Sequence, residues 1–317
     1  MNRHICLASI AAAVLLVTAC SGQGAAESVS KDGDHAPPSS GGSDSTPTPE
    51  GLSLVSLPVP EGTDVDGLVR VNGHDLAVHC RGSGHPTAVL LHGWIDDPGI
   101  TSYNFYGNEY LVDQLEPDVR VCTYDRVNVG DSETVAGTQT PEMVVGDLDG
   151  LMEAIGEDGP YVLVGQSQGG MVASAYAVAH PDKVGGIVMV DAAFDEVITL
   201  DNVLSKGEGA CDPVNRRLDG EESLQKIDNC AMYEWAYERR DLRPEVPLIY
   251  LAAKQAPWSD EIWFGPRYTK LIIPLQKSYV ASWSPGRFVW VDSDHDIQLN
   301  KPDAVPDAVR WVIEEGS

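Results

Sequence analysis

Short apolar runs rich in β-branched residues recur along the chain from residue 68 onward, and each ends at a polar residue or a glycine. We predict strands at residues 68–71, 75–79, 87–91, 119–124, 161–164, 187–190, 246–251 and 287–291. The Asn72-Gly73 pair between the first two runs is typical of a β-hairpin. The later runs are apolar throughout, which is typical of parallel strands buried on both faces.

Helical patterns fill the stretches between these runs. Residues 141–155 carry apolar side chains at helical spacing, and residues 302–315 predict a terminal helix. Residues 169–179 are small and apolar nearly all round, as in a helix packed under a sheet. Strands that alternate with helices predict a doubly wound, mostly parallel α/β sheet. The polar segment 194–244 interrupts this alternation between two strands, and we interpret it as an inserted cap or lid.

The amino-terminal residues follow a different pattern. Arg3 precedes a short apolar run, and small residues stand directly before Cys20. This arrangement is typical of a lipoprotein signal peptide, residues 1–19, whose removal leaves Cys20 as the lipidated first residue. Ordinary signal cleavage beside an incidental cysteine is the alternative. Residues 20–60 are rich in Gly, Ser and Pro and predict a flexible tether. We therefore expect a folded domain at 61–317 that is exported and lipid-anchored in a bacterial cell envelope.

Composition narrows the classes of function. The chain has 21 Lys and Arg against 48 Asp and Glu, a formal charge of -27. This excess of acidic residues argues against the basic surface that binding to nucleic acids or to anionic lipids requires. We therefore expect membrane contact only through Cys20. A hydrophobic content of 43% is enough for a large core.

Four cysteines remain in the predicted mature domain after Cys6 leaves with the signal and Cys20 is lipidated: Cys80, Cys122, Cys211 and Cys230. An even number in an oxidising compartment favours two disulfides. None of the four lies in a C-x-x-C pair, so the sequence predicts neither a metal site nor a thioredoxin-like centre.

The strongest chemical motif is Gly165-Gln166-Ser167-Gln168-Gly169. It follows a predicted strand and opens the small-residue helix, which is the setting of a nucleophile elbow. The glycines permit a tight turn, and the helix amino terminus stabilises negative charge close to Ser167. We predict Ser167 as the nucleophile.

A serine nucleophile needs a base, an orienting acid and donors for the oxyanion. His295 follows the last predicted strand, at the sheet edge where such sites assemble, and we predict it as the general base. Asp191 ends the strand after the elbow helix and is our predicted acid, with Asp260 as the alternative. We expect the backbone amides of Trp94 and Gln168 to hold the oxyanion.

Taken in chain order, these motifs resemble the α/β-hydrolase family over about residues 68–312. The matching segments besides the elbow are Leu91-His92-Gly93-Trp94, Cys122-Thr123-Tyr124-Asp125-Arg126 and Met189-Val190-Asp191-Ala192. The family's Asp-Arg-x-Gly-x-Gly-x-Ser turn has Asn128 in place of a glycine, and asparagine also tolerates positive φ. Some family members carry the acid one strand earlier than most, which supports Asp191.

The resemblance also bears on the cysteines. The family's usual sheet order makes the strands of Cys80 and Cys122 neighbours, so the resemblance implies a cross-strand disulfide. Cys211 and Cys230 both fall inside the predicted insertion, and we expect them to pair there.

Together these features predict a serine hydrolase that cleaves a small-molecule carboxylic ester without a cofactor or metal. A cofactor-free haloperoxidase or an aminopeptidase would use the same residues, and a hydrolase-fold lipoprotein that only binds a ligand is the alternative outside the enzymes. No protein partner is inferred. An aromatic cluster either lines an acyl pocket or belongs to the core: Trp258, Trp263, Phe264, Tyr268 and Trp283.

Overall fold

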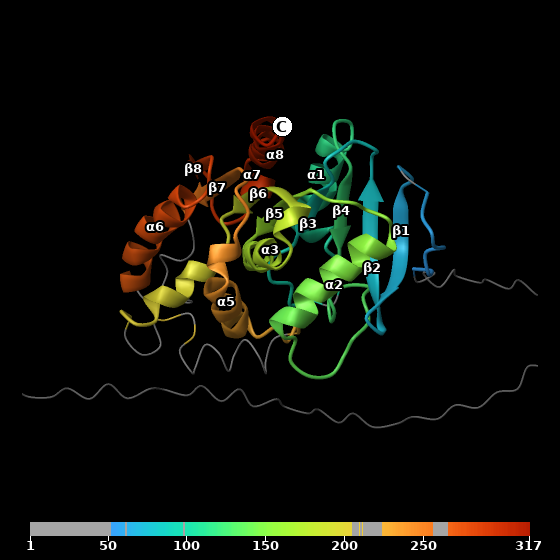
Figure 1. The fold of residues 1–317 in the computed structure, drawn as a ribbon, viewed down its shortest axis with the longest axis horizontal. Helices are drawn as coiled ribbons and strands as arrows, with labels where there is room; N and C mark the ends of the chain where they lie inside the picture. The colour runs from blue at the N-terminus through green and yellow to red at the C-terminus, as the bar shows by residue number, and fades with distance from the viewer. Residues whose placement is uncertain are drawn as a thin grey trace, which may run out of the picture. The chain divides into compact units, whose positions relative to one another are not determined.

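The sheet that organises the fold runs through most of the chain. The computed structural model describes residues 52–60, 62–97, 99–204, 209, 211, 224–255 and 266–317. Within them the strands are β1 (Val65–Val71), β2 (His74–Arg81), β3 (Ala88–Leu91), β4 (Val121–Tyr124), β5 (Tyr161–Gln166), β6 (Val184–Val190), β7 (Leu248–Ala253) and β8 (Gly286–Val291). They form one eight-stranded sheet in the order β1-β2-β4-β3-β5-β6-β7-β8 (Figure 1).

The sheet is mostly parallel, as the apolar runs predicted. In the order of the sheet, every neighbouring pair of strands from β4 through β3, β5, β6 and β7 to β8 is parallel. The strand β2, in contrast, pairs antiparallel with both β1 and β4. The β1–β2 hairpin turns at Asn72 and Gly73, whose φ angles are 50° and 96°. Both angles lie in the left-handed region that Asn and Gly tolerate best, which confirms the predicted hairpin.

Helices cover both faces of the sheet. Successive residues of β3 point to opposite faces, so Ala88 and Leu90 join one buried cluster while Val89 and Leu91 join the other. The first cluster is completed by α1 (Asn108–Leu115) and α8 (Ala304–Glu315), and the second by α2 (Pro141–Ala154), α3 (Gln168–Ala179) and α6 (Pro266–Ala281) (Figure 1). The architecture is therefore the predicted doubly wound α/β fold. Within the described residues, no helix combines the length and apolar character needed to span a bilayer.

The helices α1 and α6, which pack against the sheet, were not predicted from the sequence. The helix α1 has only eight residues, and α6 contains Pro274, which removes a backbone donor and disguises the helical pattern. Both are stabilised by tertiary packing against the sheet layers rather than by a strong local pattern.

The segment between β6 and β7, predicted as a cap or lid, contains three described helical pieces. They are η3 (Asp195–Leu200), α5 (Asn229–Glu238) and η5 (Arg240–Leu242). Asp228 caps α5 by accepting a hydrogen bond from the Ala231 amide at 2.9 Å, and α5 packs against η3 and α3.

Several predicted features lie outside the described residues. These are the signal peptide with Cys20, most of the tether, and the side chains of Trp258, Asp260, Trp263 and Phe264.

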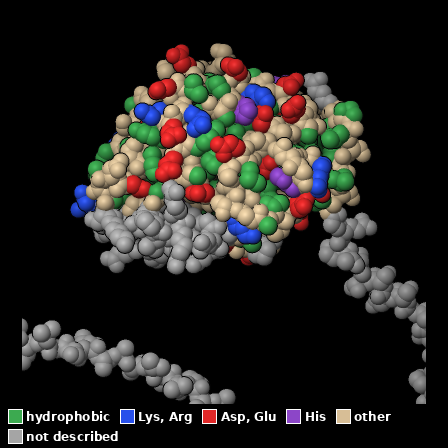
Figure 2. All heavy atoms as spheres, turned by 60° about the horizontal axis from the view of Figure 1, so that its bottom comes forward, with side chains coloured by type: hydrophobic (Ala, Val, Ile, Leu, Met, Phe, Trp, Pro, Cys, Tyr) green, Lys and Arg blue, Asp and Glu red, His purple; other side chains and the backbone are tan. Residues whose placement is uncertain are grey.

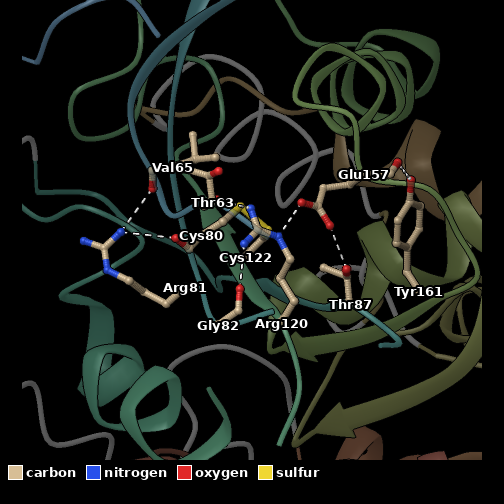
Figure 3. Close-up of a disulfide and its surroundings, with 10 residues drawn as sticks. All are labelled: Thr63, Val65, Cys80, Arg81, Gly82, Thr87, Arg120, Cys122, Glu157 and Tyr161. Carbon is tan, nitrogen blue, oxygen red and sulfur yellow. Dashed lines mark hydrogen bonds and ion pairs between the residues drawn. A yellow bond between two sulfur atoms is a disulfide. The ribbon is translucent and has the colours of Figure 1, made fainter. Parts of the chain in front are cut away.

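Both predicted disulfides are present. Cys80 and Cys122 stand opposite one another on the antiparallel strands β2 and β4, with Cα atoms 4.1 Å apart (Figure 3). Cys211 and Cys230 join two parts of the segment between β6 and β7, with Cα atoms 5.4 Å apart.

A buried arginine lies beside the first disulfide, at the amino end of β4. Arg120 forms an ion pair with Glu157 and donates to the carbonyl oxygens of Gly82 at 2.7 Å and Thr63 at 2.8 Å (Figure 3). Thr87 donates to the other carboxylate oxygen of Glu157 at 2.7 Å. The charge is therefore neutralised and satisfied inside the fold, as a buried ion pair requires.

The surface carries the acidic excess. Figure 2 shows acidic side chains scattered over one face, with Lys and Arg among them rather than in a separate basic patch. This distribution fits the net charge of -27, and that face shows no separate basic patch.

We expect graded dithiothreitol to reduce Cys211–Cys230 before Cys80–Cys122. Cys211 is half-buried, whereas Cys80 and Cys122 are at most 1% exposed and their sulfurs are shielded from a thiolate. Loss of the bond between Cys211 and Cys230, 19 residues apart, should lower stability by about 3 kcal/mol. Alkylation after each reductant step, followed by peptide mass spectrometry, measures the order. Earlier alkylation of Cys80 and Cys122 would contradict it.

Candidate active site

The candidate residues gather at one edge of the sheet because parallel strands all end there. The residues that follow the strands at this edge are His92 after β3, Asp125 after β4, Ser167 after β5, Asp191 after β6 and, a few residues further on, His295 after β8. The strands β4, β3, β5 and β6 are consecutive neighbours in the sheet. The topology alone therefore places the Asp125-Arg126 turn, the His92-Gly93-Trp94 turn, Ser167 and Asp191 in one row.

Ser167 has the backbone of a nucleophile elbow. Its φ and ψ are 50° and -120°, an uncommon conformation for a residue with a side chain. Very close packing enforces this turn: a Cβ added to Gly169 would lie 1.9 Å from the Leu91 carbonyl oxygen, and one on Gly165 would lie 2.6 Å from Gly170. Only glycine fits these positions, so α3 starts directly against β3 and β5 and leaves Ser167 half-buried at the edge.

His295 and Asp191 are joined across the sheet edge. The Nδ1 atom of His295 lies 2.8 Å from Oδ2 of Asp191, and Oδ1 of Asp191 accepts from the Ala253 amide at 3.1 Å. The Asp191 side chain is 2% exposed and that of His295 is 21% exposed. Because a carboxylate only accepts, Nδ1 of His295 is assigned as the donor, and Nε2 then carries the lone pair that a general base needs.

Gln166, a residue for which no role was predicted, connects this pair to the elbow. Its side-chain amide lies 3.4 Å from Nε2 of His295, and it is the residue directly before Ser167. A Cβ added to Gly93 would meet Oε1 of Gln166 at 2.1 Å. Gln166 is thus packed between the His295 ring and the Gly93 backbone. Its position before Ser167 was the signal that could have drawn attention to it.

The turn after β3 lies against the nucleophile. A Cβ on Gly93 would also be 3.0 Å from Cβ of Ser167, so Trp94 follows a residue in contact with the elbow. Gln168 is the first residue of α3, and the first amides of a helix have no acceptor inside it. One predicted oxyanion donor therefore directly follows Ser167, and the other directly follows a residue that packs against it.

His92 has a structural place in this turn. Its Nδ1 lies 2.8 Å from the Gly93 carbonyl oxygen, and its Nε2 accepts from the Arg126 amide at 3.4 Å. Burial, together with the nearby Arg126 charge, holds the pKa of His92 well below its usual value. A neutral ring with one donor and one acceptor fits both contacts, in line with the expectation that His92 belongs to the turn.

The neighbouring turn after β4 keeps its predicted conformation. Asn128 has a φ of 68° in place of the family's glycine, and Gly130 has a φ of 51°. The substitution therefore preserves the turn, as expected. Arg126, in the same turn, is 4% exposed, and burial lowers the pKa of its guanidinium to about 10, so it is charged at neutral pH.

Two of the predicted pocket aromatics belong to the core. Tyr268 and Trp283 are 6% and 5% exposed and pack in the cluster beneath α3 and α6. Trp283 meets Tyr279 edge-to-face, with ring centroids 5.9 Å apart. In the part of the chain that the structure describes, no group of three or more His, Cys, Asp or Glu side chains is arranged to hold a metal.

Comparison with known proteins supports this fold. The sequence profile of the alpha/beta hydrolase fold matches residues 86–208. A pimeloyl-[acyl-carrier protein] methyl ester esterase from Yersinia enterocolitica is 29% identical over 107 residues, which are 33% of this chain and 36% of that protein. An uncharacterized protein from Schizosaccharomyces pombe is 40% identical over 95 residues, which are 29% of this chain and 17% of that protein. The chain thus matches well under half of the length of these relatives.

Solved structures share the fold. A serine hydrolase from Cycloclasticus zankles has a TM-score of 0.56 at 14% identity, covering 80% of this chain and 98% of that one. An esterase from Thermogutta terrifontis has a TM-score of 0.50 at 22% identity, covering 80% of this chain and all (100%) of the other. The sheet order, the elbow and these matches define an α/β-hydrolase fold. Residues 86–208 of the chain therefore match the profile of this fold, and the described residues adopt it.

The Asp191–His295 contact generates a prediction. Asp191→Asn should lower kcat for a p-nitrophenyl ester by about 10⁴-fold, because an amide no longer orients the Nδ1–H tautomer of His295. Asp292→Asn, an exposed change in the same loop as His295, is the matched control and should retain its rate. Steady-state kinetics of both variants make the measurement. Equal kcat values for Asp191→Asn and the unmodified enzyme would refute the assignment.

Proposed function

We propose that this chain is a serine hydrolase that cleaves a carboxylic ester through an acyl-enzyme. The observation that carries the proposal is the 2.8 Å contact between His295 Nδ1 and Asp191 Oδ2, formed at the sheet edge beside a serine with a φ of 50°. A buried acceptor at Nδ1 of an imidazole and an elbow serine at the same sheet edge are the parts of an activated nucleophile.

The proposed reaction follows from this geometry. Ser167 Oγ attacks the ester carbonyl carbon while its proton moves to Nε2 of His295, and Asp191 stabilises the imidazolium. The amides of Trp94 and Gln168 donate to the oxyanion. When the carbonyl re-forms, the alcohol leaves with the proton from His295. Water then attacks the acyl-enzyme with His295 as base, and the carboxylic acid leaves as Ser167 regains its hydrogen.

Sequence similarity supports an ester substrate over the rival reactions. The related Yersinia enterocolitica protein is an esterase by name, and the match to it covers 33% of this chain. A haloperoxidase or an aminopeptidase would use the same three side chains, so only substrate tests can distinguish the reactions. An esterase is distinguished from an aminopeptidase because it turns over p-nitrophenyl esters faster than the matching p-nitroanilides. A protein that only binds a ligand would react with neither.

We further propose that the enzyme acts outside the cytoplasm, held to a membrane by a lipid on Cys20. The support is the sequence alone: a positive start, a short apolar run and small residues before Cys20, then a tether rich in Gly, Ser and Pro. Two disulfides fit an oxidising compartment.

A fluorophosphonate probe tests the nucleophile. The unmodified protein should be labelled and should hydrolyse p-nitrophenyl esters, whereas Ser167→Ala should do neither, because the probe needs an activated oxygen. Ser174→Ala is the matched control from the same helix; its hydroxyl is buried and bonded to Tyr279 at 3.1 Å. In-gel fluorescence and circular dichroism report labelling and folding. Undiminished labelling of a folded Ser167→Ala protein would end the proposal.

Fractionation of expressing bacteria tests the anchor. Cys20→Ala should move the protein from the membrane fraction to a soluble extracytoplasmic fraction, because no acceptor for the lipid remains. Cys6→Ala lies within the predicted signal peptide and serves as the control that stays membrane-bound. Immunoblots of each fraction give the result. Membrane retention of Cys20→Ala would show that the anchor is elsewhere.

A further inference from the structure

Arg126 is a buried cation whose guanidinium donates to uncharged oxygens. It is 4% exposed at the carboxyl end of β4, and within the described ranges it forms no ion pair with a carboxylate. Burying an unneutralised guanidinium costs stability unless every donor is well used. The position of those acceptors indicates what the charge does.

Two acceptors are consecutive carbonyl oxygens of the turn after β3. Nη1 of Arg126 donates to the His92 oxygen at 2.8 Å, and Nη2 donates to the Gly93 oxygen at 2.9 Å. The planar fork of the guanidinium therefore holds two successive peptide groups at once, which a lysine ammonium does not do. The His92 ring also lies 2.8 Å from the Gly93 oxygen through Nδ1.

Holding the Gly93 carbonyl determines where the next amide points. The Gly93–Trp94 peptide is not among the cis bonds of the described chain, so its carbonyl and its N–H point in opposite directions. With the oxygen drawn towards Arg126, the Trp94 N–H faces away from the guanidinium. Gly93 itself packs against Ser167, which a Cβ at Gly93 would meet at 3.0 Å.

The same guanidinium reaches the second predicted donor residue. Nη2 of Arg126 donates to Oε1 of Gln168 at 2.8 Å, and Gln168 is the residue directly after Ser167. The amide nitrogen of the Gln168 side chain donates to Asn229 Oδ1 on α5 at 2.8 Å. Gln168 is therefore held from both ends of its side-chain amide.

A residue from the segment between β6 and β7 completes the arrangement. Oε1 of Gln225 accepts from Nη2 of Arg126 at 2.8 Å and from Nε at 3.3 Å, and Nε2 of Gln225 donates to the Ile95 oxygen at 3.1 Å. Gln225 is fully buried. It therefore links the guanidinium to the Ile95 backbone, which follows the same turn.

We propose that Arg126 is the positioning residue of the oxyanion hole: its guanidinium fixes the Gly93–Trp94 peptide and the Gln168 side chain so that the Trp94 and Gln168 amides both face the reacting carbonyl. This inference rests on the proposed serine-hydrolase function. Arg126 touches no reacting atom. It acts by holding the donors before the transition state forms, which is where such donors are most effective.

Arg126→Lys keeps the charge and removes the fork, so it separates positioning from simple electrostatics. We expect kcat for a p-nitrophenyl ester to fall about 10²-fold, the loss typical of one misplaced oxyanion donor, with little change in KM. The inhibition constant of a trifluoromethyl ketone, which forms a tetrahedral oxyanion on Ser167, should rise by a similar factor. An unchanged kcat, or a loss confined to KM, would overturn the proposal.

Arg120→Lys is the matched control. Arg120 is 3% exposed, lies at the other end of β4 and also donates to two backbone carbonyl oxygens (Figure 3). Its replacement should lower the thermal midpoint but leave kcat per folded molecule unchanged. Equal kcat losses in the two variants would mean that Arg126 is only structural.

A second variant and a crystal structure keep the proposal testable if Arg126→Lys misfolds or if the proposed function is wrong. Gln225→Met removes the acceptor that aligns Arg126 and should lower kcat in the same direction by a smaller factor; full activity would count against the proposal. If the unmodified protein neither hydrolyses esters nor reacts with fluorophosphonate, the proposed function fails on its own. Crystal structures then decide the role of Arg126: a rotated Gly93–Trp94 peptide in Arg126→Met supports it, and an unmoved peptide overturns it.

Discussion

The close approach of α3 to the sheet is the constraint on which the rest of the site depends. Gly165, Gly169 and Gly170 leave no room for a Cβ, and each meets backbone or a neighbouring side chain at less than 3 Å when one is added. This contact bends the chain at Ser167 and brings the first turn of α3, with Gln168, beside the end of β3. The chemistry is therefore built from main-chain packing first and side chains second.

Two arginines that flank the short strand β4 illustrate two uses of a buried charge. Arg120 is paired with Glu157, and that pair belongs to the closed amino end of the sheet. Arg126, six residues later at the open edge, is held by the carbonyl and amide oxygens of the turns around Ser167. We interpret the difference as a division of roles between the two ends of a parallel sheet: one end stabilises the fold, and the other carries the site.

Features of the fold and the candidate site that depend on local sequence patterns could be predicted. Continuous apolar runs indicated the parallel strands, and the residues directly after them indicated Ser167, Asp191 and the turn with Asn128. The contact between Arg126 and Gln225 could not be predicted, because it joins residues 99 positions apart and Gln225 lies in a polar segment without a clear pattern. Helix α6 was missed because Pro274 disfavours a helix at the level of the sequence. In the folded protein, tertiary packing stabilises the helix despite the proline.

The disulfide between β2 and β4 has a mechanical consequence. A pull on the chain before Val65 would peel β1 and then β2 only as far as Cys80, where the load passes through the sulfurs to Cys122. The segment between the two cysteines, which are 42 positions apart, would not be stretched. That span contains β3 and the His92-Gly93-Trp94 turn, so the part of the edge that lies against Ser167 is shielded from tension applied at the amino-terminal side.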